Sequence, residues 1–149
     1  MTTHADRFPP LPPERAALWS RYLDWDRVYF PNFLGIELEE LRTDYARMRL
    51  HHRPELDQPA GVVHGGAVAA LIDTVVVPAI ASGYDERPRM VTVTMNVQYL
   101  GAVVGRDAVA EGWVERRGRS IVFCRAEVRT DPGSVVATGT LVYKVDPVE

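Results

Sequence analysis

Cysteine is almost absent from this chain of 149 residues, because Cys124 is the only one. A single cysteine excludes an internal disulfide and is typical of a reducing cytosol, so we expect a cytoplasmic location. Cys124 lies in an apolar strand pattern, which predicts a buried thiol rather than a nucleophile. Lysine is equally scarce, with Lys144 the only one among 17 basic residues. The 20 acidic residues give a net charge of −3, which argues against broad electrostatic binding to nucleic acid or an anionic membrane.

Long hydrophobic runs are also absent, with one exception. Between Ala67 and Gly83 only Asp73, Thr74 and Ser82 are polar. This run is shorter than the about 20 residues that cross a bilayer, and it carries an acid near its middle. We therefore expect a helix buried at the centre of a soluble fold. The first residues lack an apolar core behind a basic start, which argues against a signal peptide.

Residues 1–32 are predicted to form a separate N-terminal region, before a main domain of residues 33–149. The region begins with a proline-rich stretch, and a helix is predicted from Glu14 to about Tyr29. Its aromatic and apolar side chains recur at helical spacing, which indicates a face that docks on the rest of the molecule. The stripe comprises Leu18, Tyr22, Trp25 and Tyr29.

The main domain is predicted to consist of strands and one helix. Strands are predicted over 35–41, 44–52, 90–100, 107–116, 120–130 and 135–145, and the apolar helix over 65–82. Short turns between the last strands predict antiparallel neighbours. The strand over 90–100 alternates, so its apolar residues Val91, Val93, Met95, Val97 and Tyr99 are predicted on one face. The expected fold is α+β, an antiparallel sheet curled around one central helix.

The entrance of that helix reads His64-Gly65-Gly66. Two glycines allow another molecule to approach the backbone closely. The first amides of a helix have no partner within it and lie at the positive end of its dipole, so they can stabilise an oxyanion. Taken alone, the glycines are better explained as a turn that simply enters a helix.

Asp73 changes that balance. An ionised carboxylate in an apolar helix is costly unless it is paired, and this helix carries no lysine or arginine. Such a group is typical of a general base. The alternative is that Asp73 lies on an exposed strip or bonds a nearby hydroxyl such as that of Thr92. In combination with His64-Gly65-Gly66, the catalytic interpretation is favoured.

Gln58, followed by His64-Gly65-Gly66 and an acid nine residues after the histidine, resembles the hotdog-fold acyl-CoA thioesterases. The branch it most resembles groups the phenylacetate-pathway (PaaI-like) enzymes with 4-hydroxybenzoyl-CoA thioesterases. The resemblance covers about residues 33–146. It implies a hotdog fold and hydrolysis of an acyl-CoA carrying an aryl or a short to medium acyl group. It implies no metal, and no cofactor apart from the coenzyme A of the substrate.

The resemblance also implies roles for individual residues. Asp73 matches the catalytic carboxylate, which acts as a general base or a nucleophile. The Gly65 amide polarises the thioester carbonyl, and Gln58 supplies a side-chain amide near it. His64 supports the loop, and Thr92 is a hydroxyl residue beside the acid.

Gly65 and Asp73 are eight residues apart, which is about 12 Å along a helix. One straight helix therefore keeps the two groups too far apart to act on one thioester, whereas two antiparallel helices would bring them together. The resemblance agrees, since it implies homodimers with shared active sites, assembled into homotetramers.

The phosphates of coenzyme A require a basic contact. We expect it at the hairpin that carries Arg116, Arg117 and Arg119, with Ser120 as a hydroxyl donor and Gly66 as a further contact. A solvated charged turn explains the arginines equally well. The adjacent histidines at 51 and 52 lack the spacing of metal ligands.

Two other functions stay open. A hotdog dehydratase or hydratase would pair a histidine with a carboxylate as acid and base, but His64 before two glycines suits hydrolysis better. A non-catalytic acyl-CoA binder would be stabilised by ligand without turnover. Release of free thiol, with no change at the 2,3 bond, separates hydrolysis from the dehydratase or hydratase.

Overall fold

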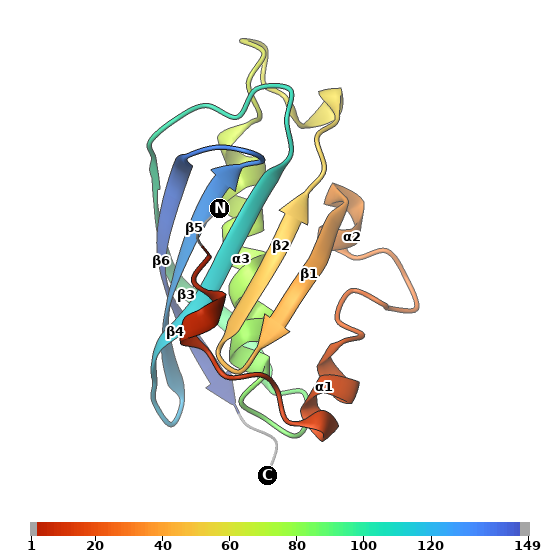
Figure 1. The fold of residues 1–149 in the computed structure, drawn as a ribbon, viewed down its shortest axis with the longest axis vertical. Coiled ribbons are helices and arrows are strands. Elements are labelled where there is room, and N and C mark those ends of the chain that lie inside the picture. Colours follow the sequence, from red (N-terminus) through yellow and green to blue (C-terminus); the bar gives the residue numbers. More distant parts are fainter. Residues whose placement is uncertain (1–2, 147–149) are drawn as a thin grey trace.

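A computed structural model describes residues 3–146. Six antiparallel strands form one sheet, in the order β1-β2-β4-β5-β6-β3, which curves around helix α3 (Gly65–Ala81) (Figure 1). The strands are β1 (Ile36–Arg42), β2 (Tyr45–Leu50), β3 (Arg89–Tyr99), β4 (Ala108–Arg117), β5 (Ile121–Thr130) and β6 (Val135–Asp146). The prediction of an antiparallel sheet around one central helix is confirmed.

The sheet encloses α3 closely, which explains why this helix is apolar all round. Two glycines let the strands approach it. A Cβ on Gly112 of β4 would lie 2.7 Å from Val75, and a Cβ on Gly139 of β6 would lie 2.7 Å from Ile72. Side chains at both positions would therefore push the sheet away from the helix. Within residues 3–146, no helix is long and apolar enough to cross a membrane.

Strand β3 lies at an edge of the sheet and contains a β-bulge between Thr92 and Thr94. The hydroxyls of Thr92 and Tyr99 both donate to α3, although regular alternation would place these two residues on opposite faces. The bulge inserts Val93 and so restores a common face. The prediction that Val91 and Val93 share a face with Tyr99 is therefore wrong, because alternation in the sequence does not show the bulge.

The N-terminal region also differs from its prediction. In place of one helix from Glu14 to Tyr29, the structure has α1 (Pro13–Trp19) and α2 (Phe30–Leu34), joined by a turn. Leu23 has a φ of +80°, a left-handed conformation that a helix does not accept. The side-chain amide of Asn32 donates to the Leu23 carbonyl at 2.9 Å and holds the turn.

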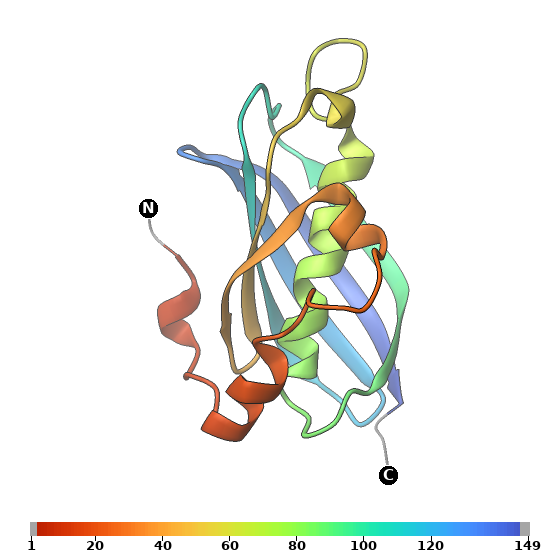
Figure 2. The ribbon, with the colours of Figure 1, turned by 90° about the vertical axis from the view of Figure 1, so that its right-hand side faces the viewer.

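This region contacts both sides of the sheet. The short 3-10 helix η1 (Ala5–Arg7) lies on the outer face, where Ala5 packs with Tyr45 and Trp113 (Figure 2). Helix α2 packs against α3 on the other side. The predicted docking of the aromatic stripe is correct for Tyr22, which packs against the core.

Cys124 of β5 faces the core and is 2% exposed. Burial raises the pKa of its thiol to about 12, so the group stays protonated at neutral pH. The prediction of a buried thiol is confirmed.

Candidate active site

The Asp73 carboxylate is held by two hydroxyl groups from neighbouring strands. Thr92 Oγ1 donates to Asp73 Oδ1 at 2.9 Å, and the Tyr143 hydroxyl donates to the same oxygen at 2.5 Å. Thr92 and Tyr143 lie opposite each other on β3 and β6. Among residues 3–146, no donor bonds to Asp73 Oδ2. One carboxylate oxygen is therefore fixed, while the other is free to react.

The hydrogen bond from Thr92 was the alternative to a catalytic Asp73 in the sequence analysis. The structure contains that bond, but it occupies only Oδ1. The two interpretations are thus compatible, because a base needs one accessible oxygen and benefits from a fixed orientation.

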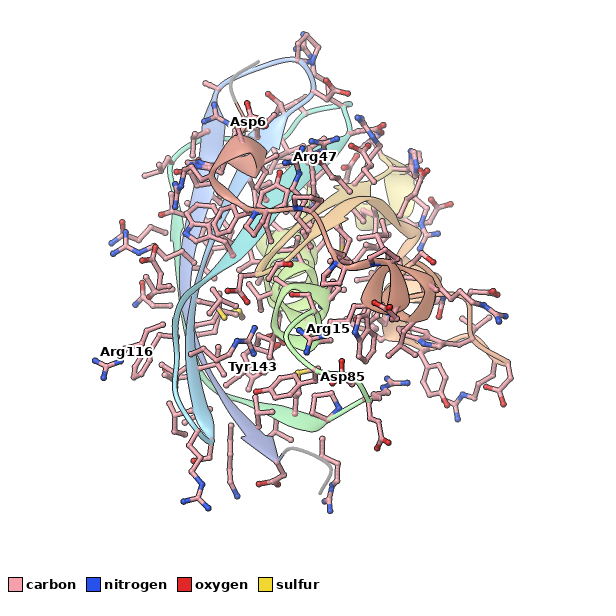
Figure 3. All side chains as sticks on the ribbon, turned by 60° about the horizontal axis from the view of Figure 1, so that its bottom comes forward. Asp6, Arg15, Arg47, Asp85, Arg116 and Tyr143 are labelled. Carbon is pink, nitrogen blue, oxygen red and sulfur yellow. The ribbon has the colours of Figure 1, made fainter. Side chains whose placement is uncertain are left out.

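Tyr143 was not found by the sequence analysis. Its side chain is 3% exposed and lies between β6 and α3 (Figure 3). Burial raises the pKa of this phenol, and the charge of Asp73 raises it further, so Tyr143 stays protonated and donates. A signal was present, because its strand neighbours Leu141 and Val145 also face the core. A phenol at such a position needs a polar partner, and Asp73 is the acid of the facing helix.

The start of α3 leaves one amide free. His64 caps the helix, with its Nδ1 accepting from the Gly66 N–H at 2.7 Å. The His64 carbonyl accepts from the amides of Ala67 and Val68. Within the described part of the chain, the Gly65 N–H has no acceptor. The amide of Gly66 is thus already engaged, whereas that of Gly65 can polarise a carbonyl.

Gly65 is also enclosed by Tyr99. The Tyr99 hydroxyl donates to the Gly65 carbonyl at 2.5 Å, and a Cβ on Gly65 would lie 3.3 Å from the Tyr99 ring. A larger residue at this position would displace the ring. Gln58 Oε1 accepts from the Ala60 amide at 2.7 Å, which closes the turn before the helix.

Gln58, Gly65 and Tyr99 line one cavity of about 410 Å³, and Asp73 does not. The structure therefore joins the predicted residues into two groups. Gln58, His64 and Gly65 gather at the start of α3, while Asp73 and Thr92 lie about 12 Å further along it.

The arginines of the β4–β5 hairpin differ from one another. Arg117 donates to Asp44 at 2.6 Å and lies 5.1 Å over the ring of Tyr84, so it already has partners within the fold. Arg116 and Arg119 are exposed and form no ion pair within residues 3–146, and Arg116 points away from the body (Figure 3). Contact of this hairpin, including the exposed Ser120, with coenzyme A stays a prediction.

The adjacent histidines both face carboxylates. His51 Nε2 lies 2.6 Å from Glu37, and His52 Nε2 lies 3.1 Å from Asp57. Within residues 3–146, no group of three side chains is arranged to hold a metal ion.

Comparison with known proteins agrees with this architecture. The model of the thioesterase superfamily matches residues 60–137. The chain is 30% identical over 115 residues to Rv1847 of Mycobacterium tuberculosis, named as a candidate esterase, covering 75% of this chain and 82% of that protein. It is 24% identical to YigI of Escherichia coli K12, a medium/long-chain acyl-CoA thioesterase, covering 78% of this chain and 84% of YigI.

A solved structure shows the same fold. The PaaI protein of the Escherichia coli phenylacetic acid degradation operon superimposes with a TM-score of 0.79 at 16% identity, covering 89% of this chain and 94% of PaaI. The fold is thus the hotdog fold. The family model and the named relatives together define the protein as a hydrolase. The chain belongs to the thioesterase superfamily.

Proposed function

We propose that this protein hydrolyses the thioester of an acyl-CoA to a free acid and coenzyme A, with Asp73 as the reacting carboxylate. The observation that carries the proposal is the asymmetry of that carboxylate. Thr92 and Tyr143 hold Oδ1, and Oδ2 accepts no hydrogen bond within the described residues. The naming of YigI as an acyl-CoA thioesterase supports acyl-CoA as the substrate class.

In the general-base route, Asp73 Oδ2 takes a proton from a water molecule whose oxygen attacks the thioester carbon. A Gly65 amide donates to the carbonyl oxygen as negative charge develops there. The C–S bond then breaks, and the thiolate of coenzyme A leaves and takes up a proton. In the alternative route, Oδ2 attacks the carbon directly, and water hydrolyses the resulting anhydride. Both routes use the same free oxygen.

The geometry favours hydrolysis over dehydration or hydration. His64 Nδ1 accepts from the Gly66 amide, so the neutral ring carries its proton on Nε2. This histidine can donate a hydrogen bond but has no free nitrogen to abstract a proton. It therefore does not provide the base of an acid–base pair in this conformation.

The reacting groups require two chains. Gly65 and Asp73 of one helix are about 12 Å apart, too far to act on one thioester. The unpaired edge of β3 supports an antiparallel partner, because Val91, Val93 and Tyr99 are all more than half exposed on it. A second copy paired there would place its Gly65 near the Asp73 of the first. Assembly of such homodimers into homotetramers stays a prediction.

The test is Asp73→Asn, assayed by release of free thiol from a panel of acyl-CoAs. The amide has nearly the shape of the carboxylate but is a poor base and nucleophile, so turnover falls on the order of 10²- to 10⁴-fold. Asp85→Asn is the matched control, because Asp85 is exposed and, among residues 3–146, its side chain bonds only Arg15. Unchanged turnover in Asp73→Asn contradicts the proposal, and binding without turnover in the wild type indicates a non-catalytic binder.

A further inference from the structure

The peptide between Gly65 and Gly66 is hydrogen-bonded on both sides. Its oxygen, the Gly65 carbonyl, accepts from the Tyr99 hydroxyl at 2.5 Å. Its nitrogen, the Gly66 N–H, donates to His64 Nδ1 at 2.7 Å. Among residues 3–146, Tyr99 is the only group outside the helix and its cap that bonds to the first turn of α3. The orientation of this turn relative to the sheet therefore depends on Tyr99.

Two consecutive glycines make the start of α3 conformationally soft. A glycine has many more accessible backbone conformations than other residues, so its own sterics do not fix the plane of the peptide that follows it. The free amide of Gly65 belongs to the preceding peptide, and the two peptides meet at the Cα atom of Gly65. A group that holds the second peptide therefore also restricts the direction of the free N–H. That direction matters, because an oxyanion donor acts only where charge develops.

The ring of Tyr99 contacts Gly65 as well as its carbonyl. A Cβ on Gly65 would lie 3.3 Å from both Cζ and the hydroxyl oxygen of Tyr99. Both residues line the cavity of about 410 Å³ that also includes Gln58. The Tyr99 side chain is nevertheless 52% exposed, so removal of its hydroxyl takes nothing from the buried core. Its interactions are therefore concentrated on the candidate active site.

Strand β3 carries both hydroxyls that hold the reacting groups. Thr92, near the start of the strand, donates to the Asp73 carboxylate, and Tyr99, at its end, donates to the Gly65 carbonyl. The β-bulge after Thr92 lets both side chains reach α3. One strand thus holds the acid and the start of the helix at their two positions along α3.

Building on the proposed hydrolysis, we propose that Tyr99 is a positioning residue for the thioester carbonyl. Its hydroxyl fixes the Gly65–Gly66 peptide and thereby aims the free Gly65 amide at the carbonyl oxygen. Tyr99 acts through Gly65 and does not touch the reacting atoms. A hydrogen bond to a developing oxyanion is stronger than one to a neutral carbonyl, so correct aim stabilises the transition state more than the bound substrate.

The experiment is Tyr99→Phe, which removes one oxygen and keeps the ring against Gly65. For the faster of hexanoyl-CoA and benzoyl-CoA, kcat falls roughly tenfold while KM changes by less than about twofold. Tyr29→Phe is the matched control, because Tyr29 is 42% exposed and lies outside the cavity of Gln58 and Gly65. It leaves both constants unchanged. Thermal unfolding and size exclusion verify that each variant keeps the fold and the oligomeric state of the wild type.

A double-mutant cycle tests whether Tyr99 and His64 act on the same peptide. His64→Ala releases the nitrogen side of that peptide, so its orientation is already lost. Adding Tyr99→Phe then lowers kcat by less than about threefold, because residues that share one partner are not additive. Losses that multiply in full overturn the proposal, as do an unchanged kcat in Tyr99→Phe and a loss confined to KM.

The substrate carbonyl provides a readout that does not depend on turnover. Asp73→Asn binds the same acyl-CoA without hydrolysing it, and infrared spectroscopy follows the isotope-labelled thioester carbonyl. Donation from the Gly65 amide lowers the stretching frequency of that carbonyl. Adding Tyr99→Phe raises the frequency again, since the amide is no longer aimed at the oxygen, whereas adding Tyr29→Phe does not. An unmoved band in Asp73→Asn/Tyr99→Phe overturns the role of Tyr99.

The two proposals fail differently. Full activity of Asp73→Asn overturns the proposed function itself. Activity that depends on Asp73, but with an unchanged kcat in Tyr99→Phe, overturns only the positioning role of Tyr99.

Discussion

The two edge strands of the sheet, β1 and β3, face the same physical problem and solve it in opposite ways. An unpaired edge exposes backbone groups that can pair with another chain. Edge β1 carries paired charges, with Glu39 bonded to Arg47 and Arg49, and Glu40 bonded to Arg42 and Arg47. Edge β3 has only one charged residue, Arg89, at its first position.

The difference indicates which edge remains available to a partner. Side chains that are already paired with charges resist the approach of a second strand, so β1 stays an end of the sheet. On β3, Val91 and Val93 are exposed, and Thr92 between them reaches inward to Asp73. The edge strand that is open to pairing therefore also contributes Thr92 to the candidate active site. We infer that assembly and catalysis are coupled through β3.

The largest expected effect comes from giving β3 the charged character of β1. The double variant Val91→Lys/Val93→Lys prevents edge-to-edge pairing and yields monomers. Its turnover falls roughly a hundredfold or more, because each site loses the partner's oxyanion donor. Light scattering after size exclusion, combined with the thiol-release assay, measures both quantities.

The matched control is Glu37→Lys on β1, which makes the same change of two charge units at an exposed position. It leaves the oligomeric state and turnover unchanged. If the double variant remains a fully active dimer, β3 is not the interface, and the inferred coupling is wrong.

A smaller effect is expected from the strand that pairs with β3. Tyr143→Phe removes the O–H that holds Asp73 Oδ1, so the carboxylate loses orientation and kcat falls roughly tenfold to a hundredfold with little change in KM.

Tyr45→Phe is the matched control for Tyr143→Phe. Tyr45 is also a buried phenol that donates to a carboxylate, that of Glu111, at 2.6 Å. It belongs to the cluster formed with η1 on the outer face of the sheet. This variant lowers stability but leaves kcat unchanged. Equal effects of both substitutions on kcat show that Tyr143 acts only through stability.

The sequence predicted the central helix and the sheet because their signals are local. An apolar run that is too short for a bilayer and carries one acid favours a core helix, and turn residues mark the strand boundaries. The chemistry of Gly65 and Asp73 predicted an oxyanion donor and a base, and the resemblance implied the same roles. The bond between Thr92 and Asp73 could be anticipated as well, because a carboxylate on an apolar helix needs a donor.

The rest depends on tertiary contacts. The bulge after Thr92 is invisible in a sequence that alternates regularly, yet it turns this hydroxyl toward α3. The helix predicted from Glu14 breaks at Leu23, whose left-handed conformation is held by an amide nine residues away. Helical spacing of the stripe did not reveal that break: Tyr22 packs against the core, but Leu18 and Tyr29 are exposed.

The smallest expected effect concerns the charged network next to β1. The backbone N–H of His52 and the side chain of Arg49 hold the pKa of Asp107 below its ordinary value, although partial burial opposes them. A carboxyl whose pKa is depressed by folding stabilises the protein above its ordinary pKa, and this contribution is lost as pH falls through the folded-state pKa. Asp107→Asn therefore lowers the free energy of unfolding by about 1 kcal/mol at neutral pH. The difference from wild type shrinks below about pH 4, where the wild-type carboxyl becomes protonated.

Urea unfolding at several pH values measures this difference, with Asp85→Asn as the exposed control. Because the network lies beside β1, turnover and oligomeric state stay unchanged, and a loss of dimers in Asp107→Asn would contradict the separation of the two edges.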